Sequence, residues 1–210
     1  MTDSRAYHHG DLKQALVDAT VEIAREEGLD GITMRSVSAR AGVSEAAPYH
    51  HFATKVDLLA AAAATSFRHF GEALAEGIAV ATSEGVEPAV GVARGYVTFA
   101  VSNPGEYELL YGRHIVELSI DTRDEVRAAG HAATETSLAA IDASLRMRGS
   151  DTSAEKVFPL CRAILHGIVS LVHEKELGSH VTLEEAIELT DRGLTALLDG
   201  LTTGTGRSMP

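Results

Sequence analysis

Several cationic and hydrogen-bonding side chains fall close together between residues 33 and 55, and they are suited to binding phosphates and base edges. Arg35 can donate two hydrogen bonds to a guanine or pair with a phosphate, and His50 can bond to either group. Lys55 opens a predicted helix, whose free backbone N–H groups also attract an anion. The stretch holds three cationic residues and one acidic residue, a net charge of +2. Nucleic-acid binding is therefore the chemistry that this stretch favours.

Two short helices joined by a tight turn are predicted to position these groups. Thr33 can cap the first helix, and Gly42 supplies the left-handed backbone that the turn needs. Ser44 is predicted to cap a second helix, which carries Glu45 to His51. Thr54 is predicted to cap a third, with Asp57 three residues on as in a capping box. A helix, a glycine turn and a second helix form the helix-turn-helix arrangement, which places the second helix in the major groove of DNA.

Four residues in this region carry structural expectations of their own. Pro48 removes one hydrogen bond near the start of the second helix, and we expect a cost below the ~3 kcal/mol of a mid-helix proline. Phe52 is expected to close the small core of the domain. Tyr49 either points outward or packs partly buried beside Phe52. Arg40 is expected to form a salt bridge within the domain in preference to a DNA contact.

The segments Thr-Met-Arg-Ser-Val from Thr33, Ala-Gly-Val-Ser from Ala41, Tyr49 to Phe52 and Thr54 to Leu59 resemble the DNA-binding domain of TetR/AcrR-type transcriptional regulators. The resemblance implies an all-α chain of about nine helices. An N-terminal three-helix helix-turn-helix domain would precede a helical domain for ligand binding and dimerisation. We expect the first domain over residues 1–55, the second over 56–202 and a disordered tail over 203–210.

The resemblance and the helical geometry together predict which side chains contact DNA. By resemblance, Tyr49 and Lys55 bind phosphates. The small Ala46 and Ala47 let the second helix lie deep in the groove, where methyl contacts with thymine are available. The predicted DNA-binding residues are Thr33, Arg35, Ser44, Glu45, Ala46, Ala47, Tyr49, His50 and Lys55.

Apolar residues at helical spacing predict further helices in the rest of the chain. Capping boxes are expected at three helix starts, where Asn103, Thr152 and Thr182 each precede a glutamate by three residues. The predicted helices outside the helix-turn-helix span about 11–27, 55–79, 88–102, 104–115, 121–148, 153–177 and 182–201.

By resemblance, the helical body encloses a pocket for a small molecule. Aromatic residues make up only 5% of the chain. Much of this content falls among the candidate pocket residues, which favours an apolar ligand with a few polar groups. Each candidate would also fit a plain core position. The candidate pocket residues are Phe70, Tyr96, Phe99, Tyr107, Tyr111, His114, Phe158, Cys161, Leu165 and His166.

The last two predicted helices are the most apolar pair in the chain. The resemblance implies that they form a four-helix bundle with their symmetry mates. A two-fold axis is also what a DNA-binding protein needs to present two recognition helices ~34–36 Å apart. We therefore expect a homodimer. The predicted interface residues, which would also suit an internal core, are Ile164, Ile168, Leu171, Val172, Leu194, Leu197 and Leu198.

These patterns predict a sequence-specific DNA-binding regulator. Following the family resemblance, we expect a repressor that binds a near-palindromic operator as a dimer and is released by a small, largely apolar ligand. The alternative is a metal-responsive regulator that uses His114, His166 and His173, or a redox-responsive one that uses Cys161. An enzyme, a resident metal and a cofactor are not expected, since no HExxH motif, nucleophile elbow or phosphate loop occurs.

The net charge of −12 looks unfavourable for a DNA-binding protein, but the acidity is spread unevenly. Residues 1–70 hold 7 basic and 9 acidic residues, whereas the remainder holds 11 and 21. An acidic body discourages indiscriminate DNA binding. We expect a cytoplasmic protein without a membrane span, because no long uncharged apolar run and no signal-peptide pattern occur. The single Cys161 suits a reducing compartment.

Overall fold

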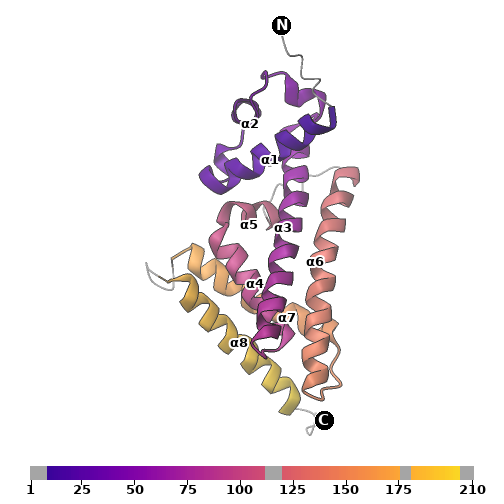
Figure 1. The fold of residues 1–210 in the computed structure, drawn as a ribbon, viewed down its shortest axis with the longest axis vertical. Coiled ribbons are helices and arrows are strands. Elements are labelled where there is room, and N and C mark those ends of the chain that lie inside the picture. The colour runs from indigo at the N-terminus through magenta and orange to yellow at the C-terminus, as the bar shows by residue number, and fades with distance from the viewer. Residues whose placement is uncertain (1–8, 112–119, 176–180, 204–210) are drawn as a thin grey trace. The chain divides into compact units, whose positions relative to one another are not determined.

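The computed structural model describes residues 9–111, 120–175 and 181–203, and these residues form helices without any strand (Figure 1). The expected all-α class is confirmed. The elements are α1 (His9–Glu27), η1 (Leu29–Gly31), α2 (Met34–Arg40), η2 (Ala47–His50), α3 (Lys55–Ser83), α4 (Pro88–Ser102), α5 (Pro104–Tyr111), α6 (Ile120–Met147), α7 (Ala154–His173) and α8 (Leu183–Thr203), where η marks a 3₁₀ helix.

The chain folds into two compact units, and neither is continuous in sequence. The first, which we call the head unit, contains Met1–Phe67 and Asn103–Gly130. The second, which we call the body unit, contains Arg68–Ser102 and His131–Pro210. The helices α3 and α6 each begin in the head unit and end in the body unit. The α5 helix, from the middle of the chain, is therefore part of the same unit as the helix-turn-helix.

The core of the head unit combines apolar residues from α1, α2, α3 and α5. Phe52 is buried in it, as expected from the sequence. Leu109 shows that α5 belongs to this core, since its side chain is fully buried among N-terminal residues. Burying a leucine or isoleucine side chain contributes roughly 1.5–3 kcal/mol to folding. The largest side chains of this core are Leu16, Ile23, Ile32, Phe52, Leu58, Leu59 and Leu109.

The α5 helix contacts α1 through backbone as well as side chains. A Cβ atom built on Gly105 would lie 1.7 Å from the carbonyl oxygen of Ala24, so only glycine fits at this point. One residue later, Glu106 is fully buried and its Oε1 lies 2.5 Å from Nε of Arg25. Glu106, which the sequence predicts to form a capping box with Asn103, therefore makes an ion pair with another helix. The buried carboxylate needs a charged partner, and Arg25 on α1 supplies it.

In the body unit, α3 and α4 approach one another closely at glycines. A Cβ on Gly95 would lie 2.3 Å from the carbonyl oxygen of Ala73, and a Cβ on Gly77 would lie 2.3 Å from that of Gly91. The α4 helix also packs against α8 and α7. At the edge of this packing, the Arg94 guanidinium donates to both carboxylate oxygens of Asp191, which joins α4 to α8. A bidentate pair of this kind fixes orientation as well as charge.

The helix ends test the local signals in the sequence. The capping boxes at Thr54–Asp57 and Thr182–Glu185 are confirmed by reciprocal hydrogen bonds of 2.7–3.2 Å. Gly42 has φ of 69°, the left-handed conformation predicted for the turn. At the start of α7 the expected cap is wrong, because Ser153 and not Thr152 occupies the N-cap position.

The C-terminal end of α7 also differs from the sequence-based expectation. The helix ends at His173, four residues before the predicted end. Lys175 follows with φ of 59°, a left-handed conformation that ends a helix. Residues 176–180 lie outside the described part of the chain.

Candidate nucleic-acid interface

The element predicted to enter the major groove is shorter and tighter than the sequence suggested. We expected an α-helix from Glu45 to His51, but the structure has turns followed by the 3₁₀ helix η2. Pro48 explains the difference. It has no N–H to donate to the carbonyl oxygen of Ser44. The N–H of Ala47, three residues after Ser44, donates to that oxygen instead at 3.0 Å, which is the hydrogen-bond pattern of a 3₁₀ helix. The Tyr49 N–H continues the pattern to the carbonyl of Ala46 at 3.2 Å.

The tight turn leaves the predicted DNA-binding side chains on the surface of the head unit. The side chain of Tyr49 is 59% exposed, so it is free to hydrogen-bond a phosphate and does not pack in the core beside Phe52. Pro48 is the buried residue of η2, so it fixes the turn against the rest of the head unit. Of the nine predicted residues, Ala47 is half-buried, whereas Thr33, Arg35, Ser44, Glu45, Ala46, Tyr49, His50 and Lys55 are exposed.

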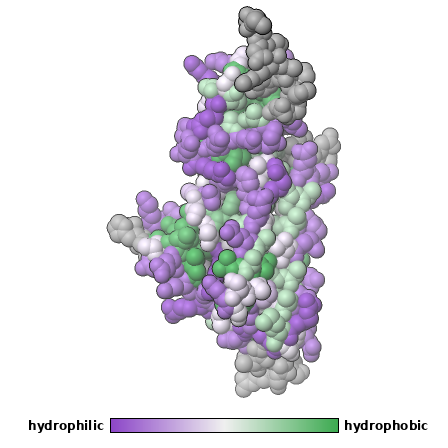
Figure 2. Space-filling view, in the orientation of Figure 1, coloured by the Kyte–Doolittle hydropathy of each residue, from purple (hydrophilic) through white to green (hydrophobic). Residues whose placement is uncertain are grey.

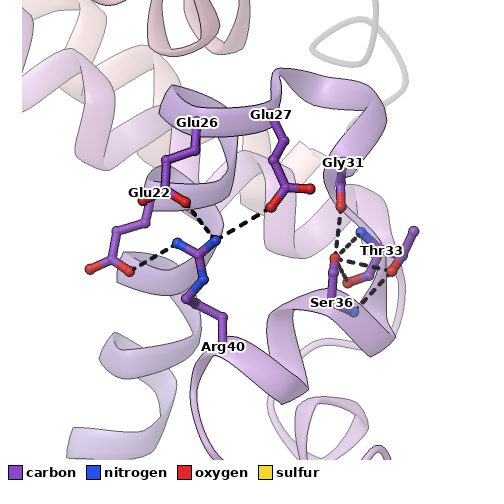
Figure 3. Close-up of polar contacts among 7 residues, drawn as sticks. All are labelled: Glu22, Glu26, Glu27, Gly31, Thr33, Ser36 and Arg40. Carbon is purple, nitrogen blue, oxygen red and sulfur yellow. Dashed lines mark hydrogen bonds and ion pairs between the residues drawn. The ribbon is translucent and has the colours of Figure 1, made fainter.

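The start of α2 is fixed by a reciprocal cap at Thr33 (Figure 3). The Thr33 hydroxyl accepts from the Ser36 N–H at 2.9 Å, and the Ser36 hydroxyl accepts from the Thr33 N–H at 2.9 Å. The Ser36 hydroxyl also lies 2.8 Å from the carbonyl oxygen of Gly31. This network holds the first turn of α2, and with it Arg35, in a defined position.

Arg40 forms the salt bridge within the domain that the sequence predicted. Its guanidinium lies 2.7 Å from Glu26, 3.4 Å from Glu27 and 3.5 Å from Glu22, all on α1 (Figure 3). The hydrogen bond to Glu26 is the largest of the effects that raise the pKa of Arg40. Arg40 therefore ties α2 to α1, and Arg35, with a side chain 85% exposed against 29% for Arg40, is the more accessible arginine of α2.

Two further charges near η2 follow from the three-dimensional packing. Glu45 lies beside Arg35, with its Oε1 atom 3.4 Å from the arginine Nε. Lys13 on α1 places its Nζ atom 5.9 Å from the centroid of the buried Phe52 ring. Lys13 is not among the residues predicted from the sequence, because only the packing of α1 brings this exposed cation next to the end of η2.

The candidate pocket residues divide between the two units. In the body unit, Phe70 packs edge-on against Tyr96 and Phe99, with ring centroids 5.2 and 5.3 Å apart. In the head unit, Tyr111 packs against Tyr107 at 5.0 Å and against Phe67 at 6.3 Å. On α7, Cys161 and Leu165 are buried, Phe158 is half-buried and His166 is exposed, and His114 lies outside the described residues.

The histidine alternative gains no support from the described part of the chain. Among residues 9–111, 120–175 and 181–203, no group of three or more ligating side chains could hold a metal ion. The ring Nε2 of His173 lies 3.1 Å from the carbonyl oxygen of Ala100, which accounts for its orientation.

Cys161 is placed as an inert thiol. Burial raises its pKa to about 11. The thiolate is the reactive form of cysteine, so the side chain remains protonated and unreactive at neutral pH. This pKa disfavours the redox-sensing alternative.

We predict that Cys161→Ser binds DNA like the unmodified protein, both before and after peroxide treatment. In the folded protein at pH 8 the thiol should react slowly with a disulfide reagent, because its pKa of about 11 leaves little thiolate. Unfolding in urea should restore the rate of an ordinary cysteine and provides the control. Rapid labelling of the folded protein, or peroxide-dependent DNA release that Cys161→Ser removes, would contradict the assignment.

The helices α7 and α8 carry apolar side chains on their outer surfaces. Leu160 and Leu171 on α7 are 48% and 37% exposed, and Leu189 on α8 is 39% exposed. Figure 2 shows hydrophobic surface gathered around α7 and the start of α8. Of the predicted interface residues, Leu171 is exposed and Ile164, Ile168, Val172 and Leu197 are half-buried.

Two residues of the predicted interface require correction. Leu194 and Leu198 are essentially inaccessible within the single chain, and they belong to the core of the body unit. The apolar periodicity of α8 covers both its inner and its outer face. A sequence pattern alone cannot separate the side chains that face the core from those that face a partner.

By length and composition alone, α7 is apolar enough to cross a membrane. Only 22% of its apolar stretch is buried within the single chain. The helix packs against α4 and α8 and carries Glu155, Lys156 and Arg162. An amphipathic helix packed in this way is typical of a core and interface helix in a helical bundle.

Comparison with known proteins agrees with this arrangement in both units. Residues 16–62 match the family described as bacterial regulatory proteins, tetR family. Residues 89–197 match the family described as the tetracyclin repressor-like C-terminal domain. An uncharacterized HTH-type transcriptional regulator, YobS from Bacillus subtilis, is 29% identical over 96 residues. That alignment spans 46% of the chain and only about half (49%) of YobS.

Solved structures share the fold over nearly the whole chain. A protein of unknown function from Rhodococcus sp. RHA1 is 25% identical, with a TM-score of 0.74, and the match covers 95% of this chain and 100% of that one. The TetR family regulator PfmR from Thermus thermophilus is 16% identical, with a TM-score of 0.62 and coverage of 91% and 99%. The multidrug binding protein EbrR, solved with imidazole, is 23% identical, with a TM-score of 0.55 and coverage of 86% and 93%.

Proposed function

Because the chain belongs to the TetR family of DNA-binding transcriptional regulators, we propose that it represses transcription by binding a near-palindromic operator as a homodimer. In this proposal a small, largely apolar ligand releases it from DNA. The protein acts in the cytoplasm and catalyses no reaction. No resident metal or cofactor takes part.

A group of exposed polar and cationic side chains on the head unit is the observation that supports the DNA-binding assignment most strongly. Tyr49, His50 and Lys55 lie exposed at and after η2, and Arg35 lies exposed at the start of α2. Hydroxyl, imidazole and ammonium groups on one short stretch supply the phosphate contacts that fix a helix-turn-helix on the duplex. Lys13 is a further exposed cation that we assign to phosphate binding.

The apolar surface of α7 and α8 supports the homodimer. Isologous packing of this surface would bury Leu160, Leu171 and Leu189, which a lone chain leaves in water. It would also remove the apolar surface of α7 from water, where such a surface promotes aggregation. The two-fold axis then pairs two head units with the two halves of a near-palindrome.

The aromatic cluster of Phe70, Tyr96 and Phe99 supports a ligand site in the body unit. Aromatic rings with one phenol group suit an apolar ligand with a few polar atoms. EbrR, which shares the fold, is described as a multidrug binding protein. A ligand that favours the DNA-incompetent state would weaken operator binding by about 5–150-fold, the usual range of coupling between sites.

The DNA upstream of the protein's own gene offers the direct test. The purified protein should protect a near-palindromic segment there, with two chains per duplex measured by analytical ultracentrifugation. A scrambled segment of the same composition is the control. A protein that binds both segments equally at physiological salt, or one chain per duplex, would contradict the proposal.

A further inference from the structure

An acidic side chain stands at the centre of the surface proposed to face DNA. Glu45 is the acidic residue of the 33–55 stretch and lies in the turn that leads into η2. Its side chain is 73% exposed and that of Arg35 is 85% exposed, with Oε1 and Nε 3.4 Å apart. The pair therefore joins the α2 side of the motif to the η2 side.

The ion pair itself does not explain why this carboxylate is present. An exposed pair of this kind contributes only about 0–1 kcal/mol to stability. On a surface that approaches phosphates, a negative charge opposes binding. A carboxylate also lacks a proton with which to contact a phosphate oxygen at neutral pH, so a phosphate is not its partner.

Base edges in the major groove offer a carboxylate a suitable partner. Carboxylate oxygens only accept hydrogen bonds, and the exocyclic amino groups of cytosine (N4) and adenine (N6) donate there. The neighbouring Ala46 is small and exposed, so it does not keep the Glu45 carboxylate away from the base edges. The guanidinium at 3.4 Å matches the guanine of a C·G pair, which accepts two hydrogen bonds from arginine.

We propose that Glu45 is a specificity-determining residue that reads an amino group of the operator, cytosine N4 in the first instance, with Arg35 donating to guanine beside it. The inference rests on the proposed function and goes beyond it by stating the chemistry of one operator position. In the free protein Arg35 and Glu45 form an ion pair. On the operator this pair separates, and each side chain hydrogen-bonds a base.

Selection of bound duplexes from a random library tests the inference. The unmodified protein should enrich cytosine at one position of each half-site, and substitution of that base should weaken binding at least fivefold. Glu45→Gln should shift the preference towards adenine, since an amide pairs with adenine N6 and N7. Glu45→Ala should remove the preference there and bind random duplexes more tightly, since a negative charge is lost.

Glu108→Gln is the matched control, since it removes an exposed carboxylate of α5 in the head unit, outside the 33–55 stretch. It should leave the enriched motif unchanged. Enrichment of adenine by the unmodified protein, lost in Glu45→Ala, would support amino-group reading with adenine N6 as the donor. Identical motifs and identical base discrimination in all the variants would overturn the inference while leaving the proposed function intact. Failure of the unmodified protein to enrich any motif would overturn both.

A second arm separates base reading from simple neutralisation of Arg35. If Glu45 acts only by holding the arginine, then its substitution has no effect once Arg35 is alanine. If Glu45 reads a base, Glu45→Gln in an Arg35→Ala background still shifts the ratio of affinities between cytosine and adenine duplexes. An unchanged ratio in that background would overturn the inference.

Discussion

Gly105→Ala is expected to destabilise the head unit by about 3 kcal/mol, at the upper end of overpacking effects. The added Cβ would lie 1.7 Å from the carbonyl oxygen of Ala24 and 2.6 Å from its carbonyl carbon. Both are backbone atoms of α1, and Ala24 is buried, so no rotamer change relieves the overlap. The α5 helix must move away from α1, which opens the packing around the buried Leu109.

The same displacement would separate Glu106 from Arg25. A buried carboxylate that loses its charged partner is strongly destabilising, by about 3–5 kcal/mol where the loss is complete. Urea unfolding followed by far-UV circular dichroism measures the change. Gly71→Ala is the control, because a Cβ at this glycine of α3 meets nothing within 4 Å. That variant should gain about 0.5–1 kcal/mol from helix propensity.

Equal unfolding free energies for Gly105→Ala and the unmodified protein would show that α5 is not fixed to α1 in solution. The inclusion of α5 in the head unit would then be contradicted. A measurement of operator affinity on the same variant is informative as well. Because α1 supports α2 and η2, a loosened α5 should weaken DNA binding even under conditions where the variant stays folded.

Leu160→Asp/Leu171→Asp is expected to convert the proposed dimer to monomers and to weaken operator binding about 100-fold or more. Both side chains are exposed in the single chain, so the change should leave its fold intact. Four carboxylates would enter each two-fold interface, where they are costly to bury. Separated heads lose the 10²–10⁴-fold gain in affinity that joining two half-site contacts provides.

Sedimentation equilibrium and fluorescence anisotropy with an operator duplex measure the two effects. Val80→Asp introduces the same charge at an exposed apolar position of α3, outside the α7 and α8 surface, and serves as the control. A dimer that survives the double substitution would show that the two-fold contact lies elsewhere. A monomer that retains full operator affinity would show that dimerisation does not matter for DNA binding.

Local sequence signals predicted the helix starts where both partners are close in sequence. Thr54 and Asp57, like Thr182 and Glu185, are three residues apart, and their bonds depend on little beyond the first turn of the helix. Glu106 has the same spacing from Asn103, but it also forms an ion pair that this spacing does not predict. Its partner Arg25 is 81 residues away, and only the packing of α5 on α1 brings the two together.

The exposure of the candidate site was predictable from the sequence, but its local geometry was not. The motif residues define the candidate interface, and the structure leaves Tyr49 and Lys55 exposed as expected. The effect of Pro48 is larger than the one lost hydrogen bond expected from the sequence, because a tighter turn replaces the first turn of the helix. In α8, periodicity identified Leu194 and Leu198 as apolar but could not show that both face the core of their own chain.

The central claim is that the exposed surface around η2 holds the duplex through phosphate contacts from Tyr49 and Lys55. The most direct test is the salt dependence of operator affinity for Tyr49→Phe/Lys55→Ala, whose aromatic ring and fold should be kept. We predict a loss of affinity that is uniform across duplex sequences, and a slope of log affinity against log salt that is shallower by about one for each lysine removed. An unchanged affinity and an unchanged slope would contradict the account.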